Sequence, residues 1–252
     1  MSTRTLTIFI GPSLRSADHQ ALHARAAEQA GGDLEVRILP PVRRGDLLKA
    51  VRDGRPGDVV LIVDGEFGQE LAVSVLEIRE TIAAGLLVLG AGSMGALRAA
   101  ECDVLGMLGF GWVFRSFRSG ALESDAEVAL MFDPLSFQPI TLPLVNVRWV
   151  ARRLNEDGAL SGLAEREAVR AAARLHFRSR TLDELDTAWR NVTALTPEAR
   201  ATLLDLLDPA HDGRHDRKRL DALEAVGIAH QLARPGRNSP LVPLRLPELV
   251  RS

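Results

Sequence analysis

The stretch GAGSMGALRAAE, residues 90–101, follows directly on the apolar run LLVL at residues 86–89. An apolar run that ends in glycine is typical of a buried strand, and the alanine-rich segment from Met94 onward predicts a helix. The glycines and the serine between them therefore mark a tight strand-to-helix junction. Such a junction can be a turn only, can hold an anion on the free N–H groups of the helix, or can present a serine nucleophile.

Short strand-like runs alternate with helix-like segments from the N-terminus to this junction. We expect strands at residues 5–10, 34–39, 58–63 and 86–90. Helices are expected at about residues 16–30, 44–52, 69–84 and 94–102. Strands joined by crossovers of helix length favour a parallel sheet with helices on both faces. The N-terminal half is therefore predicted to be a Rossmann-like or flavodoxin-like α/β layer, with the strand order left open.

The character of the chain changes after Gly120. Helical segments alone are predicted at residues 145–156, 161–176, 181–192, 196–207 and 214–226. The tail at residues 233–252 contains four prolines and is expected to run in extended form over the surface. We therefore expect an α/β core at residues 1–144 and a mainly helical C-terminal region with a Pro-rich tail at residues 145–252.

The composition narrows the class of protein. A net charge of -2 over 252 residues gives no global attraction to nucleic acid or to an anionic membrane, so neither is an expected partner. Cys102 is the only cysteine, which excludes an intrachain disulfide framework and a cysteine-based zinc cluster. The apolar runs are too short for a signal-peptide core or a membrane span, and we expect a cytoplasmic protein.

No cofactor and no metal are expected. The chain lacks the G-x-G-x-x-G dinucleotide pattern and the P-loop lysine, which argues against nicotinamide and nucleotide binding. The stretch HDGRHDRK at residues 211–218 contains histidines and aspartates, but its glycine and mixed charges favour a solvated turn over a metal site.

Three loops follow predicted strands and are expected to meet. They are residues 11–13, residues 64–66 and the junction at residues 90–95. In an open parallel sheet, ligands bind outside the carboxyl ends of the strands, so the three loops are predicted to converge on one pocket. The residues of the first and third loops that we expect to bind substrate are Gly11, Pro12, Ser13, Gly92, Met94 and Gly95.

Ser93 is the candidate nucleophile of the junction. Residues 91–95 resemble the G-x-S-x-G nucleophile elbow with Ala91 in place of the first glycine, and the N–H groups at the helix start would hold the oxyanion. Alternatively, Ser93 is the N-cap of the helix. None of the six histidines stands in a recognisable triad order to act as its base. Both interpretations stay open at this point.

Arg98 lies in the second turn of the same helix. Helical side chains lean toward the N-terminus, so Arg98 can reach back toward Ser93 and help to hold a carboxylate or thiocarboxylate. Alternatively, Arg98 forms an exposed pair with Glu101, three residues further on. Glu101 is itself a candidate substrate-binding residue.

Two groups of carboxylates are further candidates. Asp64 and Glu66 follow a strand and can orient a water or act as a base, although Asp64 would also suit a plain turn. Asp125 and Glu127, in ESDAEVALM, can supply a base, a magnesium ligand or a charge at a helix N-terminus. For Asp125 the alternative is the cap of a helix that begins at Ala126.

Several stretches occur in the order of a known family. They are FIGPSL (residues 9–14), RGD (44–46), IVDGEF (62–67), VLGAGSMGALRAAE (88–101), GMLGFG (106–111), RSGALESDAEVA (118–129) and VNVR (145–148). With these motifs the chain resembles the TfuA-like proteins, most strongly from about residue 7 to 150. Proteins of this family accompany YcaO enzymes, which activate peptide backbone amides with ATP, in the installation of thioamides.

The resemblance implies a function in sulfur delivery. The chain would release sulfide from the C-terminal thiocarboxylate of a sulfur-carrier protein, as a hydrolase that transfers an acyl group to water. A YcaO-type enzyme, the sulfur-carrier protein and a precursor peptide are the implied partners. The catalytic candidates are Ser93, Arg98, Asp64 and Glu66. The alternative is a non-catalytic adaptor that binds and activates a YcaO-type enzyme and its peptide.

The chain departs from the family at two places. The family commonly has a histidine and a lysine where this chain has Val75 and Leu76, and a doubled acid where this chain has Asp125, Ala126 and Glu127. If that histidine or acid carries chemistry, this chain has lost the activity or acts on something else.

Overall fold

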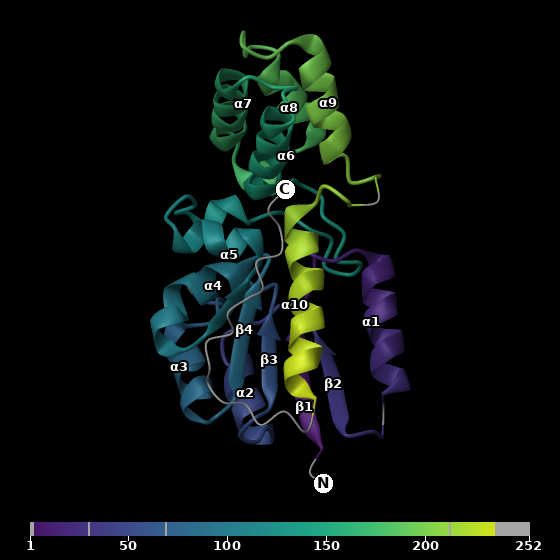
Figure 1. Cartoon of the computed structure of the whole chain (residues 1–252), viewed down its shortest axis with the longest axis vertical. Helices are drawn as coiled ribbons and strands as arrows, with labels where there is room; N and C mark the ends of the chain where they lie inside the picture. The colour runs from purple at the N-terminus through teal and green to yellow at the C-terminus, as the bar shows by residue number, and fades with distance from the viewer. Residues whose placement is uncertain (1–2, 30, 69, 212, 235–252) are drawn as a thin grey trace.

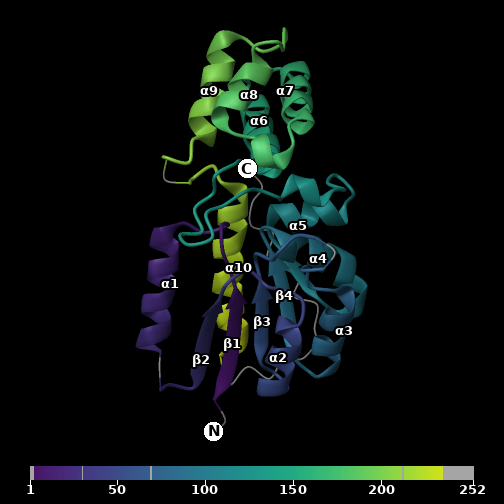
Figure 2. The same cartoon turned by 180° about the vertical axis from the view of Figure 1, so that it is seen from behind.

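The computed structural model describes residues 3–29, 31–68, 70–211 and 213–234. An α/β layer forms one end of the elongated molecule, and a group of helices lies beyond the carboxyl ends of its strands (Figures 1 and 2). One long helix, α10 (Arg217–Ala233), returns from this group to the α/β layer and lies along the strands on one face of the sheet (Figure 1).

The described part of the α/β layer contains a five-stranded sheet. Its strands are β1 (Arg4–Phe9), β2 (Leu34–Leu39), β3 (Val59–Ile62), β4 (Leu87–Ala91) and β5 (Leu108–Phe110). All neighbouring strands pair in parallel in the order β2-β1-β3-β4-β5, which confirms the predicted parallel α/β fold. The order is flavodoxin-like, and its switch point lies between β1 and β3, where sheets of this kind bind ligands.

Helices cover the sheet and form the second end of the molecule. Along the α/β layer they are α1 (Ser16–Glu28), α2 (Asp46–Asp53), α3 (Val75–Ala83), α4 (Met94–Cys102) and α5 (Gly111–Arg118). Before α10, the C-terminal helices are α6 (Leu144–Glu156), α7 (Gly162–Arg174), α8 (Leu182–Trp189) and α9 (Pro197–Leu207). No helix within the described ranges has the length and apolar composition needed to cross a membrane.

Each face of the sheet has its own core, because successive strand residues point to opposite faces. Val60 and Ile62 pack with α2–α5 on one face, whereas Leu61 and Leu89 pack with α1 and α10 on the other. Toward the strands α10 presents the small buried residues Ala222, Ala225 and Ala229. A third core around Trp189 joins α6–α9. The helical region expected from residue 145 onward therefore supplies both a separate helix group and one layer of the sheet.

Some elements differ from the sequence prediction. The sequence does not predict β5 or α5, because the GMLGFG segment at residues 106–111 contains three glycines and no clear periodicity. The third helix begins at Val75 rather than near residue 69, because Ser74 and Glu77 form a capping box there. The last helix runs to Ala233, beyond the predicted end at residue 226. Gln69 and the Pro-rich tail from residue 235 lie outside the described residues.

Candidate functional site

The three predicted loops meet at a cavity of about 180 Å³ beyond the ends of β1, β3 and β4. From these loops, its wall takes Pro12, the run from Asp64 to Glu66, and Ser93 but not Gly11, Ser13, Gly92, Met94 or Gly95. The remaining wall comes from Phe67, Val128, Leu130, Met131, Phe132, Phe177, Pro41 and Lys218. The convergence predicted from the strand ends is therefore present, and it lies at the switch point of the sheet.

Asp64 holds the loop that follows β1. Its buried carboxylate accepts hydrogen bonds from the Gly11 N–H at 2.9 Å, the Ser13 N–H at 3.0 Å and the Ser13 hydroxyl at 2.7 Å. Three donors on one carboxylate give strong, charge-assisted hydrogen bonds across the switch point. Asp64 is thus a brace between two loops, and this leaves it poorly placed to orient a water.

The glycines of the β4–α4 junction allow a tight turn and a close approach of the helix to the sheet. Gly92 has a φ of +70°, and the Ser93 N–H donates to the Ala91 carbonyl oxygen across it at 2.8 Å. At Gly95 a Cβ would lie 1.8 Å from the carbonyl oxygen of Ile62, so only glycine lets α4 pack this close to β3. These two positions explain why the opening stretch alternates glycine with other small residues.

Ser93 occupies the N-cap position of α4 but does not cap the helix with its side chain. The alternative in which its hydroxyl is the cap is therefore wrong. The residue is buried and lines the cavity. The backbone donors expected for an oxyanion are partly engaged, because the Ser93 N–H bonds Ala91 and the Gly95 N–H bonds the Val63 carbonyl oxygen at 3.1 Å. The Met94 N–H, between them, is the first amide of α4.

Arg98 does not reach back over Ser93. Its Nε donates to the carbonyl oxygen of Val73 at 2.9 Å, and its Nη1 pairs with Glu101 at 2.5 Å. Neither Arg98 nor Glu101 lines the cavity. The structure therefore has the Arg98–Glu101 pair, and Arg98 links α4 to the segment before α3.

The second carboxylate of the β3 loop stays at the cavity. Glu66 lines it, and its Oε1 pairs with Arg43 Nη2 at 3.0 Å. This pair leaves one carboxylate oxygen of Glu66 outside the ion pair. Because Asp64 is fully engaged by the first loop, Glu66 is the carboxylate of this loop that is better placed to act on a ligand.

Asp125 and Glu127 lie beside the site rather than in it. Ser124, not Asp125, caps the short 3-10 turn Asp125–Glu127, and Asp125 is exposed. Glu127 is buried in a two-pronged pair with Arg148, at 2.8 and 2.7 Å. This pair holds the backbone at Glu127, and the residue that follows it, Val128, lines the cavity.

Lys218 is the charged residue of the cavity wall that the sequence pattern does not predict. It lies in the first turn of α10, is 1% exposed, and donates from Nζ to the Val128 carbonyl oxygen at 2.9 Å. Burial lowers the pKa of its amine, and the charges of Asp64 and Asp216 only partly oppose this. A signal was available, because Lys218 precedes Ala222 by one helical turn on the stripe that packs against the sheet. The charged stretch HDGRHDRK around Lys218 favours a solvated turn and masks this helical spacing.

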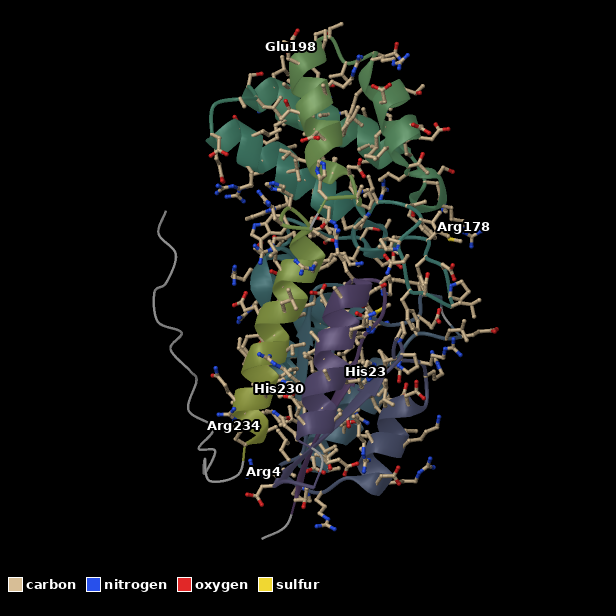
Figure 3. All side chains as sticks on the ribbon, turned by 90° about the vertical axis from the view of Figure 1, so that its right-hand side faces the viewer. Arg4, His23, Arg178, Glu198, His230 and Arg234 are labelled. Carbon is tan, nitrogen blue, oxygen red and sulfur yellow. The ribbon has the colours of Figure 1, made fainter. Side chains whose placement is uncertain are left out.

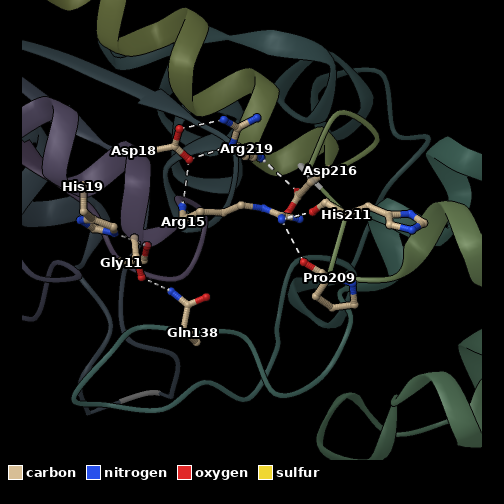
Figure 4. A network of polar contacts seen from close by, with 10 residues as sticks. Gly11, Arg15, Asp18, His19, Gln138, Pro209, His211, Asp216 and Arg219 are labelled. Atoms are coloured by element: carbon tan, nitrogen blue, oxygen red, sulfur yellow. Dashed lines mark hydrogen bonds and ion pairs between the residues drawn. The ribbon is translucent and has the colours of Figure 1, made fainter.

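The first turn of α10 is fixed from several sides. Asp216 caps it by accepting from the Arg219 N–H at 3.1 Å, and Asn146 of α6 donates to Asp216 at 2.9 Å. Arg219 also pairs with Asp18 of α1 (Figure 4). Figure 4 further shows Arg15 donating to the carbonyl oxygens of the segment before α10. Further along, α1 and α10 carry His23 and His230 on the same side of the molecule (Figure 3).

Within the described residues, no cluster of three or more histidine, cysteine, aspartate or glutamate side chains could hold a metal ion.

Comparison with known proteins adds one finding. Residues 64–181 match the family described as TfuA-like protein. No curated protein matches the chain. The matched segment includes Asp64, Glu66, Ser93 and the Glu127–Arg148 pair, whereas the loop at residues 11–13 and Lys218 lie outside it.

Proposed function

We propose that this chain, which contains a TfuA-like domain at residues 64–181, works alongside a YcaO-type enzyme in peptide backbone thioamidation. It supplies sulfur by hydrolysing the C-terminal thiocarboxylate of a sulfur-carrier protein. The observation that carries this proposal is a buried serine that does not cap its helix, placed in a cavity at the switch point of a parallel sheet.

The volume of the cavity fits the C-terminal end of a carrier protein better than a large ligand. At about 180 Å³ it is smaller than the roughly 300–1,000 Å³ typical of sites for drug-sized ligands. A C-terminal thiocarboxylate is a small planar anion at the end of an extended segment, so it enters such a cavity while the folded carrier stays outside. The precursor peptide would then be bound elsewhere, with the YcaO-type partner.

The reaction is an acyl transfer to water. The carbonyl carbon of the thiocarboxylate gains a bond to oxygen and loses its bond to sulfur. Ser93 is the nucleophile, and Glu66, oriented by Arg43, directs the water that completes the hydrolysis. Asp64 keeps the loop at residues 11–13 in place beside them. Arg98 has no part in this scheme, because it is directed to Val73 and Glu101.

The test is sulfide release from a purified thiocarboxylated carrier. We expect Ser93→Ala to lower the rate by orders of magnitude, because the attacking oxygen is removed. Ser119→Ala is the matched control, since Ser119 is exposed at the end of α5 and should leave the rate unchanged. Full activity of Ser93→Ala would remove the nucleophile from the proposal.

A non-catalytic adaptor is the second candidate, and one surface favours it. Val75 and Leu76 are 43% and 51% exposed on α3, and the neighbouring Leu71 is 52% exposed. This apolar strip stands where the resemblance leads us to expect a histidine and a lysine, and it suits contact with a protein partner. An adaptor would release no sulfide in the assay. Its binding to the YcaO-type enzyme would be lost in Val75→Ser/Leu76→Ser and kept in Ser93→Ala.

A further inference from the structure

Lys218 is the buried charged group of the cavity to which the proposed function gives no role. The 252 residues contain only two lysines, Lys49 and Lys218, although arginines are abundant. Lys49 lies on α2 with a side chain that is 66% exposed, and it pairs with Asp46 at 3.0 Å. Lys218 is 1% exposed. A chain that uses arginine almost everywhere therefore keeps one lysine where a cation is most costly.

The hydrogen bonding of Lys218 is sparse for a buried cation. Its one described hydrogen bond is to the carbonyl oxygen of Val128. Asp64 and Asp216 attract it electrostatically, but within the described residues their oxygens accept hydrogen bonds from other groups. Those groups are Gly11 and Ser13 for Asp64, and Asn146 and Arg219 for Asp216. A buried ammonium with so few partners is favoured to lose its proton.

The charged surroundings of Lys218 come from every element around it. From the loop after β3 and the α6 side they are Asp64, Glu66 and the Glu127–Arg148 pair. From its own helix they are Arg217, Arg219 and the buried Asp221. From the adjoining smaller cavity they are Asp216, Arg15, Asp208, His211, Arg214 and His215. Asp64 and Asp216 are the charges that raise the pKa of the amine, and burial outweighs them.

We propose that Lys218 is the general base that activates Ser93, and this inference rests on the proposed function. Both residues line the same cavity, and the Lys218 backbone carbonyl lies against Gly92, next to Ser93. A Cβ on Gly92 would stand 3.0 Å from that carbonyl oxygen. Serine with a lysine base is a known variant of the nucleophile-and-base arrangement, and it needs no histidine.

The step balances in protons and electrons. The neutral Lys218 amine takes the hydroxyl proton as Ser93 Oγ bonds the carbonyl carbon of the thiocarboxylate. The tetrahedral adduct then expels sulfur as the C–S bond breaks, and the Lys218 ammonium returns its proton to that sulfur, which leaves as hydrosulfide. Water next attacks the acyl-serine, giving up a proton to Lys218. The C–O bond to Ser93 breaks and the proton goes back to Oγ. The carboxylic acid that is left ionises to a carboxylate by releasing its remaining proton to solvent.

A purely structural role explains Lys218 less well. Its described tie is one hydrogen bond to a backbone carbonyl, which joins α10 to the segment at residue 128. Removing an ammonium from water costs more than one such bond returns, and a methionine would fill the same space without that cost. The presence of a buried amine at this place therefore favours a catalytic role over a structural one.

The first test reads the protonation of Lys218 directly. With carbon-13 and nitrogen-15 in lysine only, the wild-type protein gives two amine signals in NMR, and Lys49→Met assigns them. We expect the Lys218 signal to titrate at a lower pH than that of the exposed Lys49. Titration of Lys218 at or above the pH of Lys49 would overturn the proposal, whatever the enzyme acts on.

The second test measures Ser93 with a reagent that needs no thiocarboxylate. A fluorophosphonate should label Ser93, identified by mass spectrometry, with a rate that rises with pH in step with the Lys218 titration. Lys218→Met and Lys218→Arg should each slow labelling by about 10²- to 10⁴-fold, because neither residue can take a proton at neutral pH. Lys49→Met is the control and should label at the wild-type rate.

The outcomes separate the two proposals. Lys218-dependent labelling of Ser93 without sulfide release would refute the thiocarboxylate function and leave the base assignment standing. Sulfide release with labelling that is equal in wild type and Lys218→Met would refute the base assignment alone. Small primary amines added to Lys218→Ala should restore part of the labelling rate, whereas a structural role predicts no rescue.

Discussion

Lys218 and Asp221 lie one turn apart on α10, and both side chains are buried, but their hydrogen-bond partners differ. Asp221 accepts a hydrogen bond from the Val113 N–H at 2.7 Å and another from Arg217 Nε at 2.8 Å. Lys218 has a described hydrogen bond only to the carbonyl oxygen of Val128. Asp221 bonds to α5, whereas Lys218 lies at the cavity.

Burial acts on both residues in the same direction, toward the neutral form. It raises the pKa of Asp221, although Arg217 and the Val113 N–H oppose the change. It lowers the pKa of Lys218, and there the opposing groups are the charges of Asp64 and Asp216. Hydrogen bonds from a cation and a backbone amide make Asp221 a structural residue that fastens α10 to α5. Within the described residues Lys218 has no equivalent hydrogen bond to a charged group, and this difference is the reason that we propose it as the group that exchanges a proton.

The largest expected effect on stability comes from Asp221. Asp221→Ala leaves Arg217 largely buried without its carboxylate and the Val113 N–H without an acceptor. We expect the free energy of unfolding to fall by about 3–5 kcal/mol, measured by chemical denaturation. Asp205→Ala is the control, because that side chain is 68% exposed and its loss should change stability by less than about 0.5 kcal/mol. A loss below about 1 kcal/mol at Asp221 would remove the contrast with Lys218.

Lys218→Met should behave differently in the same measurement. An apolar chain of similar length removes the cost of burying an amine and sacrifices one hydrogen bond to a carbonyl. We therefore expect the free energy of unfolding to stay within about 1 kcal/mol of wild type or to increase. A decrease of more than about 3 kcal/mol would show that α10 depends on the Lys218 charge as it does on Asp221.

The smallest effect concerns the pair between Asp18 and Arg219, which joins α1 to α10 with two contacts of 2.7 Å. Burial would raise the pKa of Asp18, but Arg219 and the Arg15 N–H outweigh it and lower the pKa. A lowered folded-state pKa gives stability that is present above the unfolded value of about 3.9 and is lost as pH falls through the folded value.

Asp18→Asn tests this dependence. At neutral pH we expect it to reduce the free energy of unfolding by at most about 1 kcal/mol, because the pair is partly exposed to solvent. The difference between wild type and Asp18→Asn should shrink as the pH is lowered below about 4. A difference that is constant with pH would mean that the pair contributes through shape rather than charge.

Much of the α/β layer could be predicted from the sequence. The apolar runs, the glycines after them and the alanine-rich segment that became α4 (Met94–Cys102) are local signals, and each depends on residues within a few positions. The meeting of Pro12, Asp64 and Ser93 could also be predicted, because all parallel strands end at the same edge. In contrast, β5 is a three-residue strand with a central glycine, and it forms only because β4 offers it a partner.

The direction of individual side chains was decided by the tertiary structure. The sequence places Arg98 within reach of Ser93, but the Val73 carbonyl and Glu101 hold it elsewhere. The sequence also places Lys218 in a run of charged residues, where a solvated turn is the natural interpretation. Its burial follows from the return of α10 to the sheet, and its acceptor, Val128, is 90 residues away in the chain. Local pattern determines which segments form strands and helices, whereas partners distant in sequence determine which charged side chains are buried and which groups they bond.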